Sequence, residues 1–275
     1  MIPTQYQKFR LALGRQIDQS MFNQYFEVFL ADNPEGREIN YRVRYQVYCL
    51  ETGYENPNNY PEKIEKDDVD SRSAHFIVRA RATGTWIAAM RLVIGCLDQL
   101  PINQLANIDP ELLLKSTRAN SLDNFKLCAE VSRLCVISQY RRRPHERNVP
   151  HQIPWNPNND THEIANQERR KAPWLMLALL HSARIYSEEE KIPFWFFLAA
   201  SSLARIIKGL GMKLDQTGPA CDHRGIRYPF VANMPENFDQ LGLKYPDLAE
   251  TLRREPHYRL FSELARDEYE FPLAV

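Results

Sequence analysis

Several features that would point directly to a function are missing from this sequence of 275 residues. The 35 basic and 35 acidic residues cancel, so no overall charge favours nucleic acid or an anionic membrane. The longest apolar runs, 172–180 and 192–200, are too short to span a bilayer, and the first residues lack the apolar core of a signal peptide. We therefore expect a cytoplasmic protein without a transmembrane segment or a nucleic-acid partner.

Motifs for the common metal, nucleotide and hydrolase sites are also missing. The five cysteines have no Cys-x-x-Cys spacing, so reduced packing residues are expected. The histidines between 145 and 162 lack the second histidine of a zinc-protease helix, and we predict no metal site. Dinucleotide binding, triphosphate binding and serine hydrolysis are disfavoured because Gly-x-Gly-x-x-Gly, Gly-x-x-x-x-Gly-Lys and Gly-x-Ser-x-Gly do not occur.

The pattern that is present predicts one mixed α/β domain over residues 1–275. Helical periodicity indicates helices over 3–30 and 41–51, and β-rich runs indicate a hairpin of 74–82 with 86–95. Asp109 and Pro110 are typical of a helix start. The other expected elements are a strand over 126–138, a loop insertion at 148–170, a helix over 173–190, a strand over 193–200, a helix over 201–214, a strand over 224–234 and a helical C-terminal extension at 235–275.

Two charges interrupt the apolar stretch "CAEVSRLCVI" at 128–137. Glu130 and Arg133 would point to opposite faces of a regular strand, because side chains alternate. They can face one site only if the strand is bulged between them. A salt bridge to neighbouring strands is the alternative, and these residues alone leave both interpretations open.

Two further charged segments flank this strand. The loop acids Asp67, Asp68 and Asp70 lack the alternating ligands, glycine and distal glutamate of a calcium loop. The basic turn that begins at Arg141–Arg143 follows the strand, where it can bind phosphate, meet an acidic protein surface or form a solvated face.

The order of these charged elements resembles that of N-acyl-homoserine-lactone synthases and N-acyl amino acid synthases, which share the GNAT-like acyltransferase fold. The resemblance rests on four motifs, which are Arg44, Tyr48 and Tyr54 in "RYQVYCLETGY", Asp67-x-x-Asp70, Arg91-Leu92, and Glu130-x-x-Arg133. It covers roughly residues 40–140, and 193–214 resembles the closing part of GNAT domains. The size and motifs are most similar to acyltransferases of the PEP-CTERM/exosortase system. In two departures, Tyr54 replaces a family tryptophan and no Gly-x-Gly follows the strand.

The resemblance implies an enzyme that transfers a fatty acyl group from a phosphopantetheine thioester to the amine of an amino acid or similar small acceptor. Glu130 would be the base, directly or through water, and Arg133 would orient it and hold it ionised. A splay of strand 126–138 would free backbone N–H groups and leave room for the pantetheine arm. No tightly bound cofactor and no nucleophilic cysteine are implied. Acyl carrier protein, or coenzyme A, would deliver the acyl group as a substrate.

The resemblance also implies roles for further residues. An ionic network on the acceptor side would comprise Arg44, Asp67, Asp70 and Arg91. Tyr48, Tyr54 and Trp86 would wall the acyl or acceptor pocket, although core packing explains each equally well. Arg141, Arg142 and Arg143 would bind the phosphopantetheine phosphate or the carrier protein.

Three other functions remain open. The chain could be a homoserine-lactone synthase that uses S-adenosylmethionine, since nothing in the sequence defines the acceptor. A coenzyme A-dependent N-acetyltransferase is disfavoured by the missing glycine loop. A non-catalytic acyl-binding module is disfavoured because Glu130 and Arg133 are both present.

Overall fold

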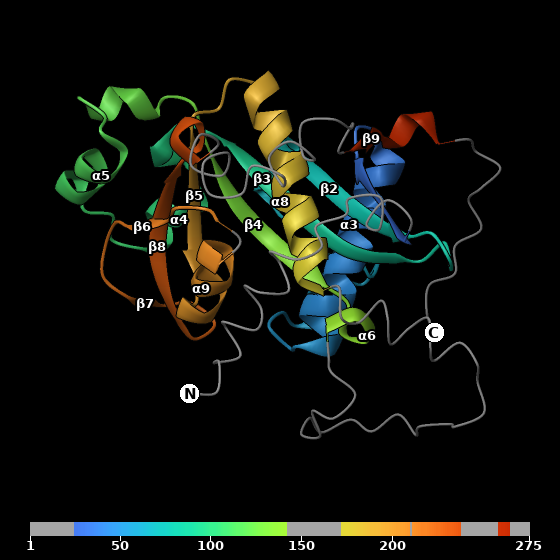
Figure 1. The fold of residues 1–275 in the computed structure, drawn as a ribbon. Coiled ribbons are helices and arrows are strands. Elements are labelled where there is room, and N and C mark those ends of the chain that lie inside the picture. Colours follow the sequence, from blue (N-terminus) through green and yellow to red (C-terminus); the bar gives the residue numbers. More distant parts are fainter. Residues whose placement is uncertain (1–24, 142–171, 210, 238–257, 265–275) are drawn as a thin grey trace, which may run out of the picture.

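A mixed β-sheet forms the centre of the computed structural model, which describes residues 25–141, 172–209, 211–237 and 258–264 (Figure 1). Its strands are β1 (Phe26–Leu30), β2 (Ser73–Ala80), β3 (Trp86–Gly95), β4 (Cys128–Val136), β5 (Phe194–Ala199), β6 (Asp215–Gln216), β7 (Cys221–Asp222), β8 (Ile226–Asn233) and β9 (Arg259–Leu260). The order across the sheet is β6-β8-β5-β4-β3-β2-β1-β9, and β7 pairs with β8. All pairs are antiparallel except β4–β5 and β1–β9.

Helices cover both faces of this sheet. They are α3 (Pro34–Tyr45), which continues into a π-helical turn (Gln46–Glu51), then α4 (Pro101–Leu105), α5 (Pro110–Thr117), α6 (Ser138–Arg141), α8 (Ala172–Glu189) and α9 (Ser201–Gly209). On β2, the ring of His75 contacts Tyr41 of α3, and the ring of Phe76 contacts Tyr186 of α8. Because consecutive strand residues point to opposite faces, α3 and α8 lie on opposite sides of the sheet. The predicted mixed sheet flanked by helices is confirmed.

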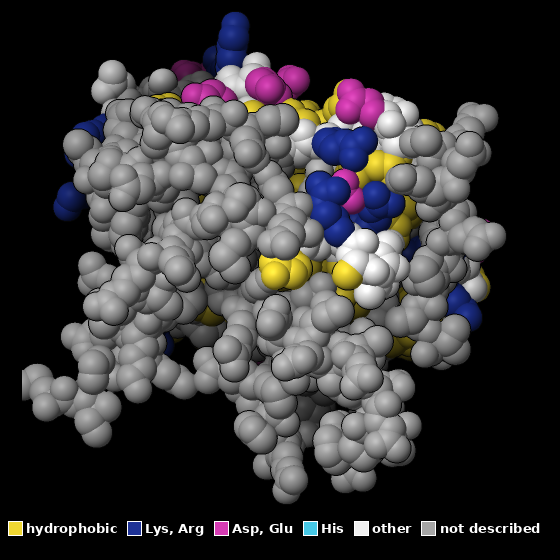
Figure 2. Space-filling model, turned by 45° about the vertical axis from the view of Figure 1, so that its right-hand side comes forward, with side chains coloured by type: hydrophobic (Ala, Val, Ile, Leu, Met, Phe, Trp, Pro, Cys, Tyr) yellow, Lys and Arg dark blue, Asp and Glu magenta, His cyan; other side chains and the backbone are white. Residues whose placement is uncertain are grey.

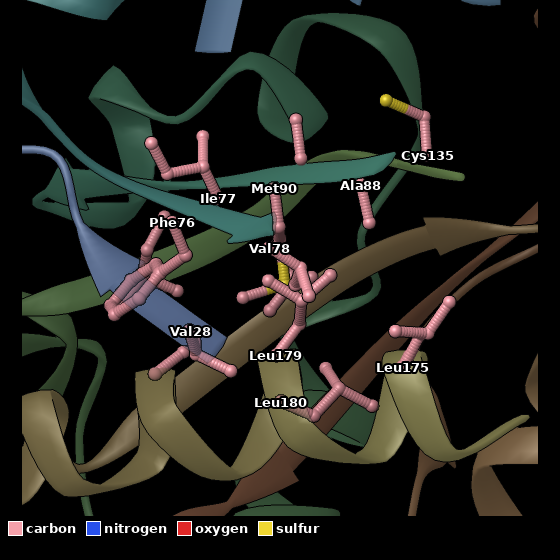
Figure 3. Packing of buried hydrophobic residues seen from close by; sticks show 14 of the residues in the cluster. Val28, Phe76, Ile77, Val78, Ala88, Met90, Cys135, Leu175, Leu179 and Leu180 are labelled. Carbon is pink, nitrogen blue, oxygen red and sulfur yellow. The ribbon is translucent and has the colours of Figure 1, made fainter. Parts of the chain in front are cut away.

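The main core lies between α8 and the sheet. Leu175, Leu179 and Leu180 of α8 are buried at helical spacing and point towards strand residues such as Val28 and Val78 (Figure 3). Each buried leucine stabilises the fold by about 1.5–3 kcal/mol relative to an exposed one. This packing holds the central strands together and so fixes the position of β4.

A second apolar cluster lies between β5 and the segment that joins β3 to β4. Ile102 of α4 and Leu113 of α5 are fully buried there, together with Phe125 and Phe196. Asp109 caps α5 as predicted, because its Oδ1 accepts from the backbone N–H groups of Glu111 and Leu112. The joining segment is thereby packed against the sheet close to β4.

The predictions for the two ends of the chain were partly wrong. Residues 26–30, expected at the end of helix 3–30, form β1, because this short apolar run pairs with β2 along its whole length. In the C-terminal extension 235–275, the described segment 258–264 is not helical, since β9 pairs with β1 and a 3₁₀ turn follows at Phe261–Glu263. Residues 3–24, 238–257, 265–275 and the insertion 148–170 lie outside the described residues.

The described surface mixes charges of both signs, as the zero net charge requires. Figure 2 shows Lys and Arg side chains beside Asp and Glu side chains on one face of the molecule. Within the described ranges, no helix is both long and apolar enough to cross a membrane.

Strand β4 is bulged and parts from β5. Arg91 of β3 lies opposite Ser132 and Ala89 opposite Cys135, so Arg133 and Leu134 together face Met90. Arg133 has a φ of 54°, a left-handed conformation that costs an ordinary residue about 1–2 kcal/mol. Pairing of β4 with β5 ends at Val131 and Phe197, although both strands continue. The predicted bulged strand is confirmed.

Candidate active site

A cavity of about 600 Å³ lies where β4 and β5 separate. Its walls come from β4, from the end of β5 with α9, from α4 and from the turn between β7 and β8. Glu130 and Arg133 both line it, as do Tyr48 and Tyr54. Volumes of a few hundred Å³ suit small-molecule and cofactor sites.

An ion-pair network borders the cavity and joins four of the predicted residues. Arg44 binds Asp70 through two hydrogen bonds of 2.7 and 3.1 Å. Arg91 donates to Asp70 at 2.7 Å and to Asp67 at 2.5 and 2.9 Å. Asp67 and Asp70 also cap the short 3₁₀ turn that starts the approach to β2. The structure therefore brings Arg44, Asp67, Asp70 and Arg91 together.

Glu65, which sequence reasoning missed, connects the network to β4. Its carboxylate is fully buried and accepts from Arg44 at 2.5 Å and from Arg133 at 2.9 Å. Glu55, in the loop after the π-helical turn, lies 3.8 Å from Arg133 and forms an ion pair with Arg224 of the β7–β8 turn. The only signal in the sequence was the group of acids that ends at Asp70, in which Glu65 does not stand out.

Mutual pairing keeps the network ionised. Burial alone would raise the pKa of Asp70, but hydrogen bonds and the charge of Arg44, with Arg91, hold it well below its usual value. Burial likewise opposes ionisation of Glu65, yet the charges of Arg44 and Arg133 lower its pKa. The guanidinium of Arg44 has a raised pKa, because Glu65 and Asp70 more than offset its burial. These groups are fixed charges rather than proton donors or acceptors.

Glu130 lines the same cavity but is not part of the network. Its Oε2 accepts one hydrogen bond of 2.7 Å, from the backbone N–H of Ile102, and no residue in the described ranges forms an ion pair with it. Burial raises the pKa of Glu130 to about 7, although this hydrogen bond and the nearby charges of Arg91, Arg133 and Arg72 act in the opposite direction. The bulge thus brings both strand charges to one cavity, but only Arg133 joins the ionic network. The expectation that Arg133 holds Glu130 ionised is wrong, because Arg133 pairs with Glu65 and burial dominates the pKa of Glu130.

The three predicted aromatic residues separate into two groups. Tyr48 and Tyr54 line the cavity with their rings 6.3 Å apart, and Arg133 lies 5.4 Å above the ring of Tyr48. Trp86 does not line this cavity. It packs instead against Phe29 and Phe261 at ring distances of 5.5 and 5.8 Å, beside the β1–β9 edge.

The predicted basic turn lies largely outside the described residues, and the buried cysteines beside the site are not activated nucleophiles. Arg141 ends α6, and Arg142 and Arg143 lie outside the described residues. Burial raises the pKa values of the Cys128 and Cys135 thiols to about 12, so neither is a thiolate nucleophile at neutral pH. The described residues include no group of His, Cys, Asp and Glu side chains arranged to hold a metal ion.

Comparison with solved structures places this fold among acyl-transferring synthases. TofI, solved in a ternary complex with an inhibitor and MTA, is 15% identical, with a TM-score of 0.51 over 84% of this chain and 98% of that one. FeeM, an N-acyl amino acid synthase from uncultured soil microbes, is 13% identical, with a TM-score of 0.50 over 79% and 96%. BjaI, a CoA-dependent acyl-homoserine lactone synthase bound to MTA, is 13% identical, with a TM-score of 0.53 over 86% and 92%.

Sequence comparison identifies the domain itself. No curated protein matches the chain. Residues 43–149 match the family model described as an acetyltransferase (GNAT) domain, and this range contains the end of α3, the β2–β3 hairpin and the whole of β4. Residues 43–149 therefore match a GNAT acetyltransferase domain, and the described fold is similar to that of solved acyl-homoserine-lactone and N-acyl amino acid synthases.

Proposed function

We propose that this protein is a cytoplasmic N-acyltransferase that moves a fatty acyl group from a phosphopantetheine thioester to the amine of an amino acid or similar small acceptor. Glu130 carries the proposal. It is a buried carboxyl with a pKa of about 7, and it faces a cavity opened by the separation of β4 and β5. A carboxyl group with this pKa is about half ionised at neutral pH, and its ionised form can accept the proton that the amine must lose before it attacks.

In the proposed reaction, Glu130 accepts a proton from the acceptor ammonium group, directly or through one water. The neutral nitrogen then attacks the thioester carbonyl carbon, an N–C bond forms and the C–S bond breaks. As the tetrahedral intermediate collapses, the nitrogen releases its second proton to solvent and the proton held by Glu130 passes to the departing thiolate, so the products are an amide and a free thiol. No cysteine is acylated, which agrees with the raised pKa values of Cys128 and Cys135.

The separated strands supply the groups that receive the thioester. Beyond Val131, β4 has no β5 partner, and Ser132, Arg133 and Leu134 line the cavity. Backbone N–H groups on this edge can donate to the thioester oxygen as negative charge develops. The fixed pairs of Arg133 with Glu65 and of Arg91 with Asp67 keep this edge in place.

Acyl carrier protein is the proposed donor, with coenzyme A as the alternative. The motif order supports this, as does the missing Gly-x-Gly after β4 where a coenzyme A pyrophosphate would bind. Arg141, Arg142 and Arg143 are proposed to meet the carrier protein or the phosphate of its prosthetic group. The same motif order supports a relation to the PEP-CTERM/exosortase acyltransferases.

Product analysis tests the proposal. The purified protein is incubated with acyl-carrier-protein thioesters of several chain lengths and a panel of amino acids, other amines and S-adenosylmethionine, and products are identified by mass spectrometry. We expect N-acyl amino acids, and a matched acyl-coenzyme A should be the poorer donor. Acyl-homoserine lactone as the product would assign the lactone-synthase alternative. Retained acyl chain without transfer to any amine would indicate a binding module and contradict the proposal.

A further inference from the structure

We propose that Arg72 binds a carboxylate on the acceptor and thereby selects amines that carry one. This inference rests on the proposed N-acyltransferase function and adds a specificity-determining residue to it. Arg72 was not among the site residues expected from the sequence. The structure places it in the wall of the cavity that contains Glu130.

The ion pairs around the cavity leave two of its arginines, Arg72 and Arg227, without a carboxylate partner. Four arginines and four carboxylates pair with one another and balance, namely Arg44, Arg91, Arg133 and Arg224 with Glu55, Glu65, Asp67 and Asp70. Arg72 and Arg227 also line the cavity, as does the exposed carboxylate of Asp68, and none of these three forms an ion pair with any described residue. Arg72 and Arg227 are thus the two lining arginines without an ion-pair partner in the described ranges, and either can meet negative charge on a ligand.

The guanidinium of Arg72 is held in place by the backbone. Its Nη1 donates to the carbonyl of Ile94 at 2.9 Å, and its Nη2 donates to the carbonyl of Gln99. Neutral acceptors leave its charge uncompensated, and further N–H groups of the fork remain for a ligand. Gly95 makes room for this arrangement, since a Cβ there would lie 2.9 Å from Nη1 of Arg72.

Arg72 is a better candidate than Arg227 for binding the carboxylate of the acceptor, because it lies closer to Glu130. Arg72 and Glu130 are bound by the same short segment, because Nη2 of Arg72 donates to the carbonyl of Gln99 and the N–H of Ile102, three residues later, donates to Glu130. Arg227 lies in the β7–β8 hairpin and donates to the carbonyls of Ile226 and Arg224. An amine at Glu130 that belongs to an α-amino acid carries its carboxylate one carbon away, so a cation beside the base is the group that meets it.

The test compares each amino acid with its own carboxamide as acceptor, for the full-length wild type and for Arg72→Ala. The readout is the ratio of kcat/KM for the acid to kcat/KM for the amide, which does not depend on the fraction of active enzyme. The different amine pKa values of acid and amide cancel when variants are compared. We expect the wild type to prefer the acid and Arg72→Ala to lower this ratio by about 10- to 100-fold, as for a lost charged hydrogen bond.

Three further variants make the result specific. Arg227→Ala removes the other unpaired cation and should retain the ratio. Arg72→Lys keeps the positive charge but loses the planar guanidinium group, and it should retain part of the wild-type preference for the acid. Gly95→Ala crowds Nη1 of Arg72 while leaving the residue present, and should lower the ratio even if Arg72→Ala folds poorly.

The outcomes separate this inference from the proposed function. Absence of transfer to any amine by the wild type would remove both. Transfer with equal use of acid and amide, or an unchanged ratio in Arg72→Ala and Gly95→Ala, would overturn the role of Arg72 and leave the acyltransferase intact. A ratio lost in Arg227→Ala and retained in Arg72→Ala would also overturn it.

Discussion

Glu65 and Glu130 are both buried carboxyl groups beside β4, yet their surroundings give them opposite properties. Glu65 is surrounded by the guanidinium groups of Arg44 and Arg133, which lower its pKa despite burial. Glu130 has one backbone N–H as a hydrogen-bond partner, and burial raises its pKa to about 7. The comparison shows that pairing, more than burial, decides which carboxylate is a fixed charge and which exchanges a proton at neutral pH.

The two regions also differ in what they do for the fold. A buried ion pair repays its desolvation only with good geometry and full pairing, and loss of one partner leaves an uncompensated charge. The network around Glu65 meets these conditions and holds Arg133 in its left-handed conformation at the bulge. The Glu130 region contributes a cavity wall and a proton acceptor, so its removal should affect chemistry before stability.

The largest expected effect is on turnover in Glu130→Gln. Removal of the proton acceptor should lower kcat/KM by about 100- to 10,000-fold, while the unfolding free energy at pH 6 changes little because the wild-type carboxyl is largely protonated there. Steady-state kinetics and chemical denaturation measure the two quantities. Glu27→Gln is the matched control, since Glu27 is equally buried on β1 but away from the cavity. It should lose stability and keep its turnover, and unchanged turnover in Glu130→Gln would remove Glu130 from the base role.

Glu65→Gln should lower the unfolding free energy much more than Glu130→Gln does. Arg44 and Arg133 would remain buried without their carboxylate, so we expect a loss of about 3–5 kcal/mol in unfolding free energy. Urea unfolding followed by circular dichroism gives the value. Glu62→Gln, an exposed change in the same loop, should stay within about 0.5 kcal/mol of the wild type. Equal stability of the two variants would mean that the network does not support the fold.

The smallest expected effect is a pH-dependence of stability that originates at Glu130. Its folded-state pKa of about 7 exceeds the unfolded value of about 4.3, so this group destabilises the fold progressively as pH rises through that interval and up to about 7. Between pH 5 and pH 8.5, the wild type should lose about 2.6 kcal/mol that Glu130→Gln does not lose. Parallel unfolding curves across this range test the sign. An equal dependence in both proteins would show that the pKa of Glu130 is not raised.

Some structural features could be predicted from the sequence alone. The hairpin and the Asp109 cap followed from local patterns, since alternation and capping are properties of neighbouring residues. The bulge in β4 was expected only through the family resemblance, because the two charges alone also fitted a salt bridge to neighbouring strands. The gathering of Arg44, Asp70, Arg91 and Arg133 was anticipated only through the order of family motifs, because the chain segments that carry them are far apart.

Other elements could not be read in this way. The run 26–30 is a strand because β2 and β9 pair with it, and a short apolar run does not distinguish a strand from a helix. Trp86 packs at the β1–β9 edge because Phe29 and Phe261 meet there from opposite ends of the described chain. Glu65 and Arg72 are ordinary loop charges in the sequence, and only their neighbours in space set them apart.

The sequence by itself determined which charges belong to strand 128–137 and that a regular strand could not bring both to one site. Only the tertiary structure decided that Arg133 is ion-paired and that Glu130 is not. The bulge turns Arg133 towards Glu65, while α4 places the N–H of Ile102 on Glu130. The physical reason is that a pKa depends on the charges and solvent within a few ångströms, and these are supplied by residues distant in the sequence.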